Sequence, residues 1–255
     1  NDTHEKTVKL LKDNNNFGMN NQGQLTLLKQ ELVPTFADNK CRFGLKNKYE
    51  LGEKPHGHGD VHSLLFNSGL AKKWQTELNV KWLLFFQDTN PVALRALPST
   101  LGVSVKNNFA MNSMTVPRTA GQAIGAITKL TNKNDVNDIL TINVEYNQLA
   151  ALLPEGDVNE KETGYSKFPG NTNSFIINND TYCIVMDKYK GAIPEFVNPK
   201  YTDDTKTIFK KPTRLECMMQ EYPKLLSKYQ REYGKNEEEK KSNDDEDDDG
   251  NNKES

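Results

Sequence analysis

A run of five apolar residues from Trp82 to Phe86, followed by Asp88 and Asn90, is the feature that most limits how this chain can fold. The run is too short for an independent helix and is rich in the aromatic residues that pleated sheets favour. It therefore predicts a buried strand that ends in a carboxylate. Ligands of open α/β sheets bind beyond the carboxyl ends of strands, so Asp88 is placed to hold a divalent cation or a hydroxyl group. The alternative is that Asp88 makes a turn or caps the next helix.

The stretch KPHGHGDVH, from Lys54 to His62, precedes this strand. Its glycines, Gly57 and Gly59, allow a ligand to approach the backbone closely, and exposed amides at the start of a helix attract anions. The segment from Val61 to Leu78 has helical apolar spacing, interrupted by a single glycine. We therefore expect a turn, a helix and a buried strand that together form a ligand site on an α/β scaffold.

Three of the four histidines, His56, His58 and His62, stand in this turn and suggest a metal site. With Asp60, they are similar to the H-x-H-x-D-H signature of metallo-β-lactamase-like hydrolases. Here Val61 separates Asp60 from the last histidine, which should turn His62 away from a shared site. A zinc site would need three or four ligands in fixed geometry, and its candidates are His56, His58 and Asp60.

Length and composition favour a soluble intracellular protein. The chain has 255 residues, and no apolar run approaches the roughly 20 residues that a membrane helix requires. Its first residues, NDTHEKTVKL, lack the apolar region of a signal peptide. The three cysteines are far apart in sequence and odd in number, which is typical of free thiols in a reducing compartment.

The charges are distributed unevenly along the chain. Residues 236–255 carry ten acidic and three basic residues, so their balance is −7, and the remainder of the chain is +5 for a net charge of −2. Such a segment cannot bury enough apolar surface to fold, so residues 231–255 are expected to be a disordered acidic tail or insertion after one domain at 1–230. The basic remainder suits an anionic ligand but is too weakly charged to indicate nucleic acid.

The chain alternates between helical and strand patterns. Leu25 to Val33 has helical spacing that stops at Pro34. Gln30, within this segment, offers the donor and acceptor pair that a base such as uracil requires, or is a plain surface residue. A further helix is expected at 91–104, with a turn at Pro98 and Gly102. Strands are expected at 109–114, 123–130 and 139–146, which gives a mixed α/β sheet.

Three later positions carry polar groups suited to sugar or phosphate. Glu145 ends an apolar strand, and Asn171 lies in PGNTN, which follows a glycine turn. Carboxylates and amides hold sugar hydroxyls because each hydroxyl both donates and accepts, although asparagines in turns need no ligand. Lys210 and Lys211 precede a helix expected from about Thr213, where the helix dipole would favour a phosphate.

Several blocks, in order along the chain, closely resemble the UDP-sugar pyrophosphorylases of plants and protozoa, and are more distantly similar to UDP-glucose and UDP-N-acetylglucosamine pyrophosphorylases. The resemblance extends from about Asp2 to Tyr229. It implies a Rossmann-like nucleotidyltransferase fold, with a mixed sheet flanked by helices. The blocks are NNFGMNNQGQLTLLKQELV, KPHGHGDVHSLLFNSGLAKKW, FFQDTN, TAGQAIGAI, NVEYNQL, ETGYSKFPGNTN, AIPEFVNPKY and PTRLECMMQEYPK.

The resemblance implies a cytoplasmic uridylyltransferase that converts UTP and a sugar 1-phosphate to UDP-sugar and pyrophosphate with Mg²⁺. By motif, Gln30 matches the glutamine that reads uracil, and Gly57 matches the glycine whose backbone faces the nucleotide. Asp88 matches the acidic residue that holds magnesium near the α-phosphate. The sugar phosphate oxygen would attack the α-phosphorus in line, and the protein would align the reactants and neutralise their charge.

The resemblance also implies a sugar phosphate site. His58 matches the side chain near the sugar phosphate, and Glu145 and Asn171 match positions that bind sugar hydroxyls. Lys211 matches the phosphate-binding lysine by its spacing ahead of TRLECMM. The other lysines that this spacing allows are Lys200, Lys206 and Lys210.

One departure from the pattern is the absence of the family's glycine-rich phosphate loop, Leu-x-Gly-Gly-x-Gly-x-Arg. The chain also lacks an initiating Met. The resemblance therefore implies an internal fragment whose sheet is incomplete because the first βαβ unit is missing, and which is inactive alone. Two other classes stay open: a zinc-dependent hydrolase that uses the HGHGDVH cluster, and a catalytically dead protein that binds nucleotide or sugar. The preferred sugar and the oligomeric state are not determined by these motifs.

Overall fold

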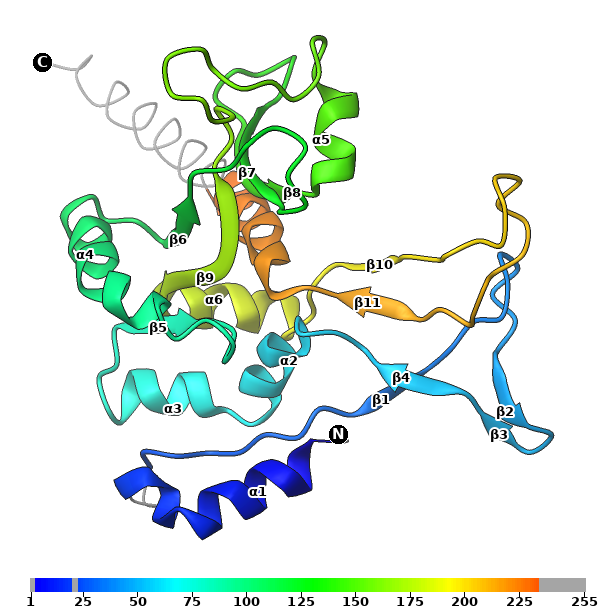
Figure 1. Ribbon diagram of the computed structural model, residues 1–255. Helices are drawn as coiled ribbons and strands as arrows, with labels where there is room; N and C mark the ends of the chain where they lie inside the picture. The colour runs from blue at the N-terminus through cyan, green and yellow to red at the C-terminus, as the bar shows by residue number, and fades with distance from the viewer. Residues whose placement is uncertain (1–2, 20–22, 234–255) are drawn as a thin grey trace, which may run out of the picture. The chain divides into compact units, whose positions relative to one another are not determined.

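The computed structural model describes residues 3–19 and 23–233 (Figure 1). The chain divides into two compact units, each made of two segments. The turn unit comprises Asn1–Ser68 and Gly191–Met219, and the sheet unit comprises Gly69–Lys190 and Gln220–Ser255. Each is described here by itself. Among the described helices, none has the length and apolar character needed to cross a lipid bilayer.

The sheet unit is built on one five-stranded sheet in which β9 is the central strand. The hydrogen-bonded order is β5-β9-β7-β8, and β6 also pairs with β9. Every pairing described in this sheet is antiparallel. The strands are β5 (Trp82–Phe85), β6 (Met111–Val116), β7 (Ala126–Thr131), β8 (Ile139–Val144) and β9 (Gly170–Asn178).

Successive side chains of a strand point to opposite sides of the sheet, and successive positions of β9 are buried. Strand β9 is therefore buried on both faces. Ile176 belongs to an apolar cluster with Ala93 and Met114. The ring of the neighbouring residue, Phe175, stacks on the ring of Phe85 with 5.3 Å between their centroids. The ring of Phe85 also contacts that of Tyr182, with 5.8 Å between centroids. Helices therefore cover both faces of the strand, which explains why its apolar run does not alternate.

Helices of the sheet unit connect and cover these strands. Figure 1 shows β9 leading directly into α6, whose N-cap Asn178 accepts a hydrogen bond from the Thr181 N–H. A second apolar cluster joins Leu149 of α5 to β7 and β8. The helices are α3 (Leu70–Thr76), α4 (Ala93–Lys106), α5 (Tyr146–Leu152), α6 (Asn179–Tyr189) and a helix described over 222–233.

The turn unit contains short strand pairs and little helix. Its pairs are β1 (Leu32–Pro34) with β4 (Glu53–Pro55), β2 (Leu45–Asn47) with β3 (Glu50–Leu51), and β10 (Glu195–Val197) with β11 (Leu215–Cys217). Its helices are α1 (His4–Asp13), the 3-10 helix η1 (Asn15–Gly18) and α2 (Asp60–Asn67). The 3-10 helix η2 (Met219–Glu221) follows β11 and precedes the helix at 222–233.

The α/β class and the buried strand at 82–86 are confirmed, since β5 occupies Trp82–Phe85. The helix expected from Val61 to Leu78 is two helices, α2 and α3, which meet at Gly69 with φ +69°. The helix expected at 91–104 forms as α4 and continues through Pro98, so the expected turn there is wrong.

Three other expectations are wrong for tertiary reasons. The segment from Leu25 to Val33 is not helical, because its end forms β1 and pairs with β4. The alternative that the asparagines of PGNTN are ordinary turn residues is wrong, because residues 170–173 belong to β9, which pairs with β6. The helix expected from about Thr213 begins only at residue 222, because residues 215–217 pair with β10. The expected boundary at 230/231 falls inside this helix, and residues 234–255 of the expected tail lie outside the described residues.

Candidate functional site

The turn between β4 and α2 is held against β11. The Gly59 N–H donates to the Cys217 carbonyl at 3.1 Å, and the Cys217 N–H donates to the His56 carbonyl at 3.1 Å. Gly57 has φ +133°, and a Cβ placed on it would lie 2.2 Å from the Cys217 carbonyl oxygen. Glycine is therefore required at Gly57 by the close approach of another backbone segment, whatever the ligand.

Gln30 reaches this turn from the segment that was expected to be helical. Its Nε2 donates to the Gly57 carbonyl oxygen at 2.5 Å and to Asp60 Oδ2 at 2.8 Å. The structure thus brings together Gln30 and Gly57, the two residues that motif comparison assigned to the nucleotide. Both described bonds use the donor half of the amide, so the acceptor Oε1 is the group that Gln30 can offer to a ligand.

The three histidines of the turn have three different environments. His62 is fully buried, and its Nε2 lies 3.0 Å from the Met219 carbonyl oxygen. Desolvation lowers the pKa of His62 to about 4, although that hydrogen bond raises it. His62 is therefore a neutral core residue, and it is not among the described groups that could share a metal ion.

His58 is exposed on one side, and its Nδ1 accepts a hydrogen bond of 3.2 Å from the Met219 N–H. This bond leaves the proton of the neutral ring on Nε2. Desolvation by the surrounding protein lowers the pKa of His58, and the nearby Glu216 carboxylate partly opposes this. His58 therefore offers an uncharged N–H donor to a ligand at neutral pH.

His56 lies in a cluster with Asp60, Cys217 and Glu195. Its Nδ1 is 2.7 Å from Asp60 Oδ1 and 3.6 Å from Cys217 Sγ, and its Nε2 is 2.9 Å from Glu195 Oε1. Burial raises the pKa of the Cys217 thiol to about 12, and the Asp60 carboxylate reinforces this. The candidate ligand set that includes His58 is therefore corrected: the described groups that approach one another are His56, Asp60 and Cys217.

Asp88 lies just beyond the carboxyl end of β5, in the sheet unit. It is exposed in a turn closed by a 3.0 Å hydrogen bond from the Asn90 N–H to the Gln87 carbonyl. Both of the expected features, a position after the strand and a turn, are present. The turn presents the carboxylate to solvent, where it is accessible to a cation.

Glu145 and Asn171 are joined through Asn143 in the sheet unit. Asn143 Nδ2 donates to Glu145 Oε1 at 2.9 Å, and Asn143 Oδ1 accepts from Asn171 Nδ2 at 3.1 Å. Asn171 Nδ2 also donates to Asn173 Oδ1 at 2.8 Å. The structure therefore brings the two expected sugar-binding residues into one polar network, in which Asn143 lies on β8, Asn171 lies on β9 and Glu145 directly follows β8.

Lys211 is exposed in a bend of the turn unit, before β11. The helix that was expected to start beside it starts at residue 222, so the predicted phosphate site at a helix N-terminus is wrong. Lys211 still precedes the strand that packs against the Gly57 turn. Of the other candidates, Lys210 donates its N–H to the Lys200 carbonyl at 2.7 Å, which closes the loop between these residues.

Sequence reasoning missed residues whose partners are remote along the chain. Cys217 was not recognised as a neighbour of His56 because 161 positions separate them. Arg118 is fully buried and forms a 2.8 Å ion pair with Asp157, which is 4% exposed. Asn143 could have been noted, since it lies two residues before Glu145, and residues two apart in an extended chain point to the same side.

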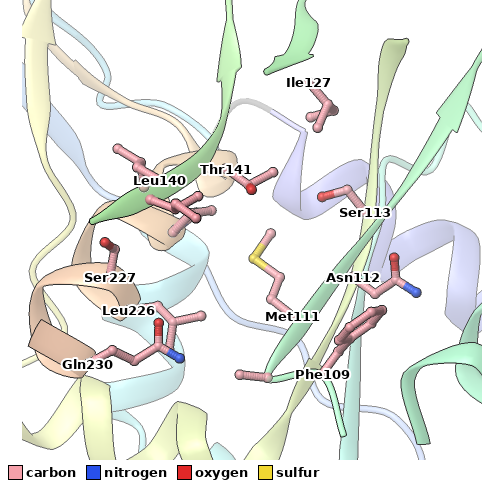
Figure 2. Close-up of a pocket in the computed structure, with 13 residues that line it drawn as sticks. Phe109, Met111, Asn112, Ser113, Ile127, Leu140, Thr141, Leu226, Ser227 and Gln230 are labelled. Carbon is pink, nitrogen blue, oxygen red and sulfur yellow. The ribbon is translucent and has the colours of Figure 1, made fainter. Parts of the chain in front are cut away.

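A cavity of about 440 Å³ lies elsewhere in the sheet unit (Figure 2). It is lined by residues of β6, β7, β8 and the helix at 222–233, and Met111 projects into it. None of the predicted site residues is among the described residues that line it. The predicted residues instead lie in two places: Gln30, Gly57, His58 and Lys211 in the turn unit, and Asp88, Glu145 and Asn171 in the sheet unit.

No family model matches the chain. Individual proteins do match it. A UDP-sugar pyrophosphorylase of Oryza sativa subsp. indica is 53% identical over 232 residues, which cover 88% of this chain and 37% of that protein. One from Arabidopsis thaliana is 54% identical over the same number of residues and the same shares.

Over most of its length, this chain is similar to UDP-sugar pyrophosphorylases. It spans 37% of the length of these curated relatives. The solved UDP-N-acetylglucosamine pyrophosphorylase of Trypanosoma brucei has the same fold, with a TM-score of 0.65 over 88% of this chain and 42% of that one, at 17% identity. Because these proteins are named as pyrophosphorylases, the comparisons do not support a zinc-dependent hydrolase or a catalytically dead binding protein.

Proposed function

We propose that this chain is part of a uridylyltransferase that converts UTP and a sugar 1-phosphate to UDP-sugar and pyrophosphate. The observation that carries this proposal is the identity of 53% to a UDP-sugar pyrophosphorylase over 232 residues. The three free thiols, Cys41, Cys183 and Cys217, are compatible with a cytoplasmic setting. The site residues of each unit suggest a role for that unit by itself.

Gln30 is the proposed reader of uracil. Its amide nitrogen is anchored on Gly57 and Asp60, which fixes the direction of Oε1 before a ligand arrives. The N3–H group of uracil is a donor that this oxygen accepts, whereas cytosine has an acceptor at that position. A fixed acceptor therefore favours uridine over cytidine nucleotides, because an acceptor facing another acceptor stays unpaired.

His58 and Lys211 are proposed to contact phosphate. The neutral His58 ring offers Nε2–H as a donor, since its Nδ1 accepts from Met219. Lys211 is exposed and adds the positive charge that His58 lacks. Such groups stabilise the charge that develops when a sugar phosphate oxygen attacks the α-phosphorus and pyrophosphate leaves.

Asp88 is the proposed holder of Mg²⁺. Its carboxylate is exposed just beyond the end of β5, and Mg²⁺ is commonly held by one or two carboxylates together with substrate phosphates. The residues present therefore fit this ion, which when bound would neutralise phosphate charge. The role of this chain is to present Asp88 on a short turn after a buried strand, so that its position is defined.

Glu145 and Asn171 are proposed to bind hydroxyls of the sugar. Both side chains hydrogen-bond to the same partner, Asn143. A carboxylate accepts from a hydroxyl and an amide can both donate and accept, which suits the two-sided hydrogen bonding of sugars. The hydrogen bonds to Asn143 fix the direction of both side chains before a ligand binds.

The test is a binding measurement on the 255-residue protein, because the chain spans only part of its relatives. In calorimetry with Mg²⁺ present, we expect UDP-glucose to bind and ADP-glucose to bind at least about tenfold more weakly, because the adenine ring offers no matching N–H group to Gln30. Gln30→Ala should weaken UDP-glucose binding about tenfold, which corresponds to one hydrogen bond of about 1.4 kcal/mol. Gln122→Ala, at an exposed turn position, is the matched control.

Two outcomes would contradict the proposal. One is that neither UTP nor UDP-glucose binds to protein that is folded by circular dichroism. The other is that Gln30→Ala and Gln122→Ala bind UDP-glucose equally well. For phosphate, Lys211→Ala should weaken UTP binding more than Lys46→Ala, which removes another exposed lysine, on β2.

A further inference from the structure

Three side chains of the turn unit point ligand atoms of different chemistry at one place. They are His56 Nδ1, Asp60 Oδ1 and Cys217 Sγ, and all three lie within 4.8 Å of one another. None of them is strongly exposed: the side chains of His56 and Asp60 are 16% and 18% exposed, and Cys217 is 2% exposed. Imidazole, carboxylate and thiolate are the ligand types that zinc takes in proteins.

The distances in this cluster match a tetrahedral zinc centre closely. Cys217 Sγ lies 3.6 Å from His56 Nδ1 and 3.5 Å from Asp60 Oδ1. With Zn–S of about 2.3 Å and Zn–N or Zn–O of about 2.0 Å, tetrahedral angles give an edge of about 3.5 Å for both pairs. Only the 2.7 Å separation between His56 Nδ1 and Asp60 Oδ1 must widen, by about 0.6 Å, which a small side-chain rotation provides.

Groups that would orient the ligands are also present. His56 Nε2 lies 2.9 Å from Glu195 Oε1, so Glu195 would accept the ring proton's hydrogen bond at Nε2 when the lone pair of Nδ1 binds a cation beside Asp60 and Cys217. Asp60 uses Oδ2 to accept from Gln30 Nε2, which leaves Oδ1 directed at the cluster. A carboxylate behind a ligating histidine and a hydrogen bond to a ligating carboxylate are the usual supports of zinc ligands.

We propose that His56 Nδ1, Asp60 Oδ1 and Cys217 Sγ form a binding site for Zn²⁺ or a similar thiophilic divalent cation. The fourth position opens into a cavity of about 320 Å³ lined by Ser63, Ala192 and Ile193 among others, which admits water. When the Zn–S bond forms, the Cys217 thiol releases its proton to solvent. The site is distinct from Asp88, since an oxygen-preferring ion such as Mg²⁺ does not select a thiolate.

The site would join three segments of the turn unit. Cys217 ends β11, His56 follows β4, and Asp60 begins α2. A bound cation would therefore fix the turn that carries Gly57 and His58. The inference does not depend on the proposed transferase activity, because metal binding is measured without nucleotide.

The experiment is a Zn²⁺ titration of the 255-residue protein after treatment with a chelator and a thiol-free reductant. Competition with a chromophoric chelator measures affinity, and Co²⁺ substitution reports a thiolate-to-metal absorption band if Cys217 is a ligand. Millimolar Mg²⁺ is present throughout, so that carboxylates of the acidic segment 244–249 do not contribute. We expect one equivalent of Zn²⁺ to bind and the thiolate band to appear with Co²⁺.

Variants separate this site from adventitious binding. Cys217→Ser should abolish the thiolate band and weaken Zn²⁺ binding at least about 100-fold, whereas Cys41→Ser, at an exposed thiol, should change neither. Glu195→Gln leaves all three ligands in place and should weaken binding about tenfold. Glu195 is 42% exposed, so this variant is expected to fold. Binding that survives Cys217→Ser, or that Cys41→Ser removes, would overturn the proposal.

Discussion

In the turn unit, hydrogen-bonded side chains come from segments as far apart as Asp60 and Cys217, which are separated by 157 positions. In the sheet unit, Asn143, Glu145 and Asn171 lie on or beside strands whose register is fixed by backbone hydrogen bonds. The cluster in the turn unit holds titratable side chains in close contact, whereas the network in the sheet unit consists mostly of amide side chains. The comparison teaches that a sheet can place a polar network by register, whereas the turn depends on a remote strand packing against glycine.

The largest expected effect tests that dependence. Gly57→Ala should destabilise the protein by at least about 3 kcal/mol, because it adds a strained positive φ to a clash with the Cys217 carbonyl oxygen at 2.2 Å. Gly121→Ala is the matched control, with φ +73° and no atom within 4 Å of its Cβ. It should cost about 1 kcal/mol, measured by urea unfolding. Equal costs would show that the close approach of β11 does not hold the turn.

The next effect concerns the buried ion pair of the sheet unit. Asp157→Asn should cost about 2–3 kcal/mol at pH 7, because it leaves the fully buried Arg118 guanidinium without its counter-charge. Lys9 and Asp13 form an exposed pair, and Asp13→Asn should change stability by less than about 0.5 kcal/mol. Thermal and urea unfolding of both variants measure the contrast.

The same pair predicts a dependence on pH. Burial raises the pKa of Asp157, but hydrogen bonds from Ser166 and the Gly121 N–H and the charge of Arg118 together lower it below the ordinary value of 3.8. A lowered folded-state pKa stabilises the protein above pH 3.8, and this contribution is lost as pH falls through the folded-state pKa. Unfolding measured from pH 7 downward should therefore show wild type converging toward Asp157→Asn in acid. A constant gap would contradict this.

The amide network should give a smaller effect. Asn143→Ala removes the bonds to Glu145 and Asn171, and should cost about 1–2 kcal/mol by urea unfolding. Asn134→Ala, at an exposed position in the loop before β8, should cost less than about 0.5 kcal/mol. If the two costs were equal, the network would not contribute to the stability of the sheet unit.

The smallest effect is expected at Lys211. It is exposed and stands eleven positions before the helix at 222–233, so Lys211→Ala should change the unfolding free energy by less than about 0.5 kcal/mol. A larger loss would mean that Lys211 has a structural partner in the turn unit. The measurement also shows whether any loss of UTP binding in this variant arises from the site rather than from unfolding.

Local pattern was sufficient where the apolar period of a segment matches the secondary structure that it forms. The apolar run at 82–86 predicted β5, and the helical spacing of 61–78 predicted α2 and α3, because period and burial agree in both. It failed at 25–33 and at 213–217, where pairing with β4 and β10 overrides helical spacing. A strand pairing partner supplies backbone hydrogen bonds that a single segment does not reveal.

The sequence by itself determined the α/β class, the strand before Asp88, the concentration of histidines near Gly57 and the resemblance that singled out Gln30, Glu145 and Asn171. Only the tertiary structure decided that Cys217, rather than His58, joins His56 and Asp60, and that Arg118 is buried with Asp157. The physical reason is the separation of the contacting residues along the chain. Spacing along a chain reports contacts within one element, whereas these contacts join residues that only folding brings together.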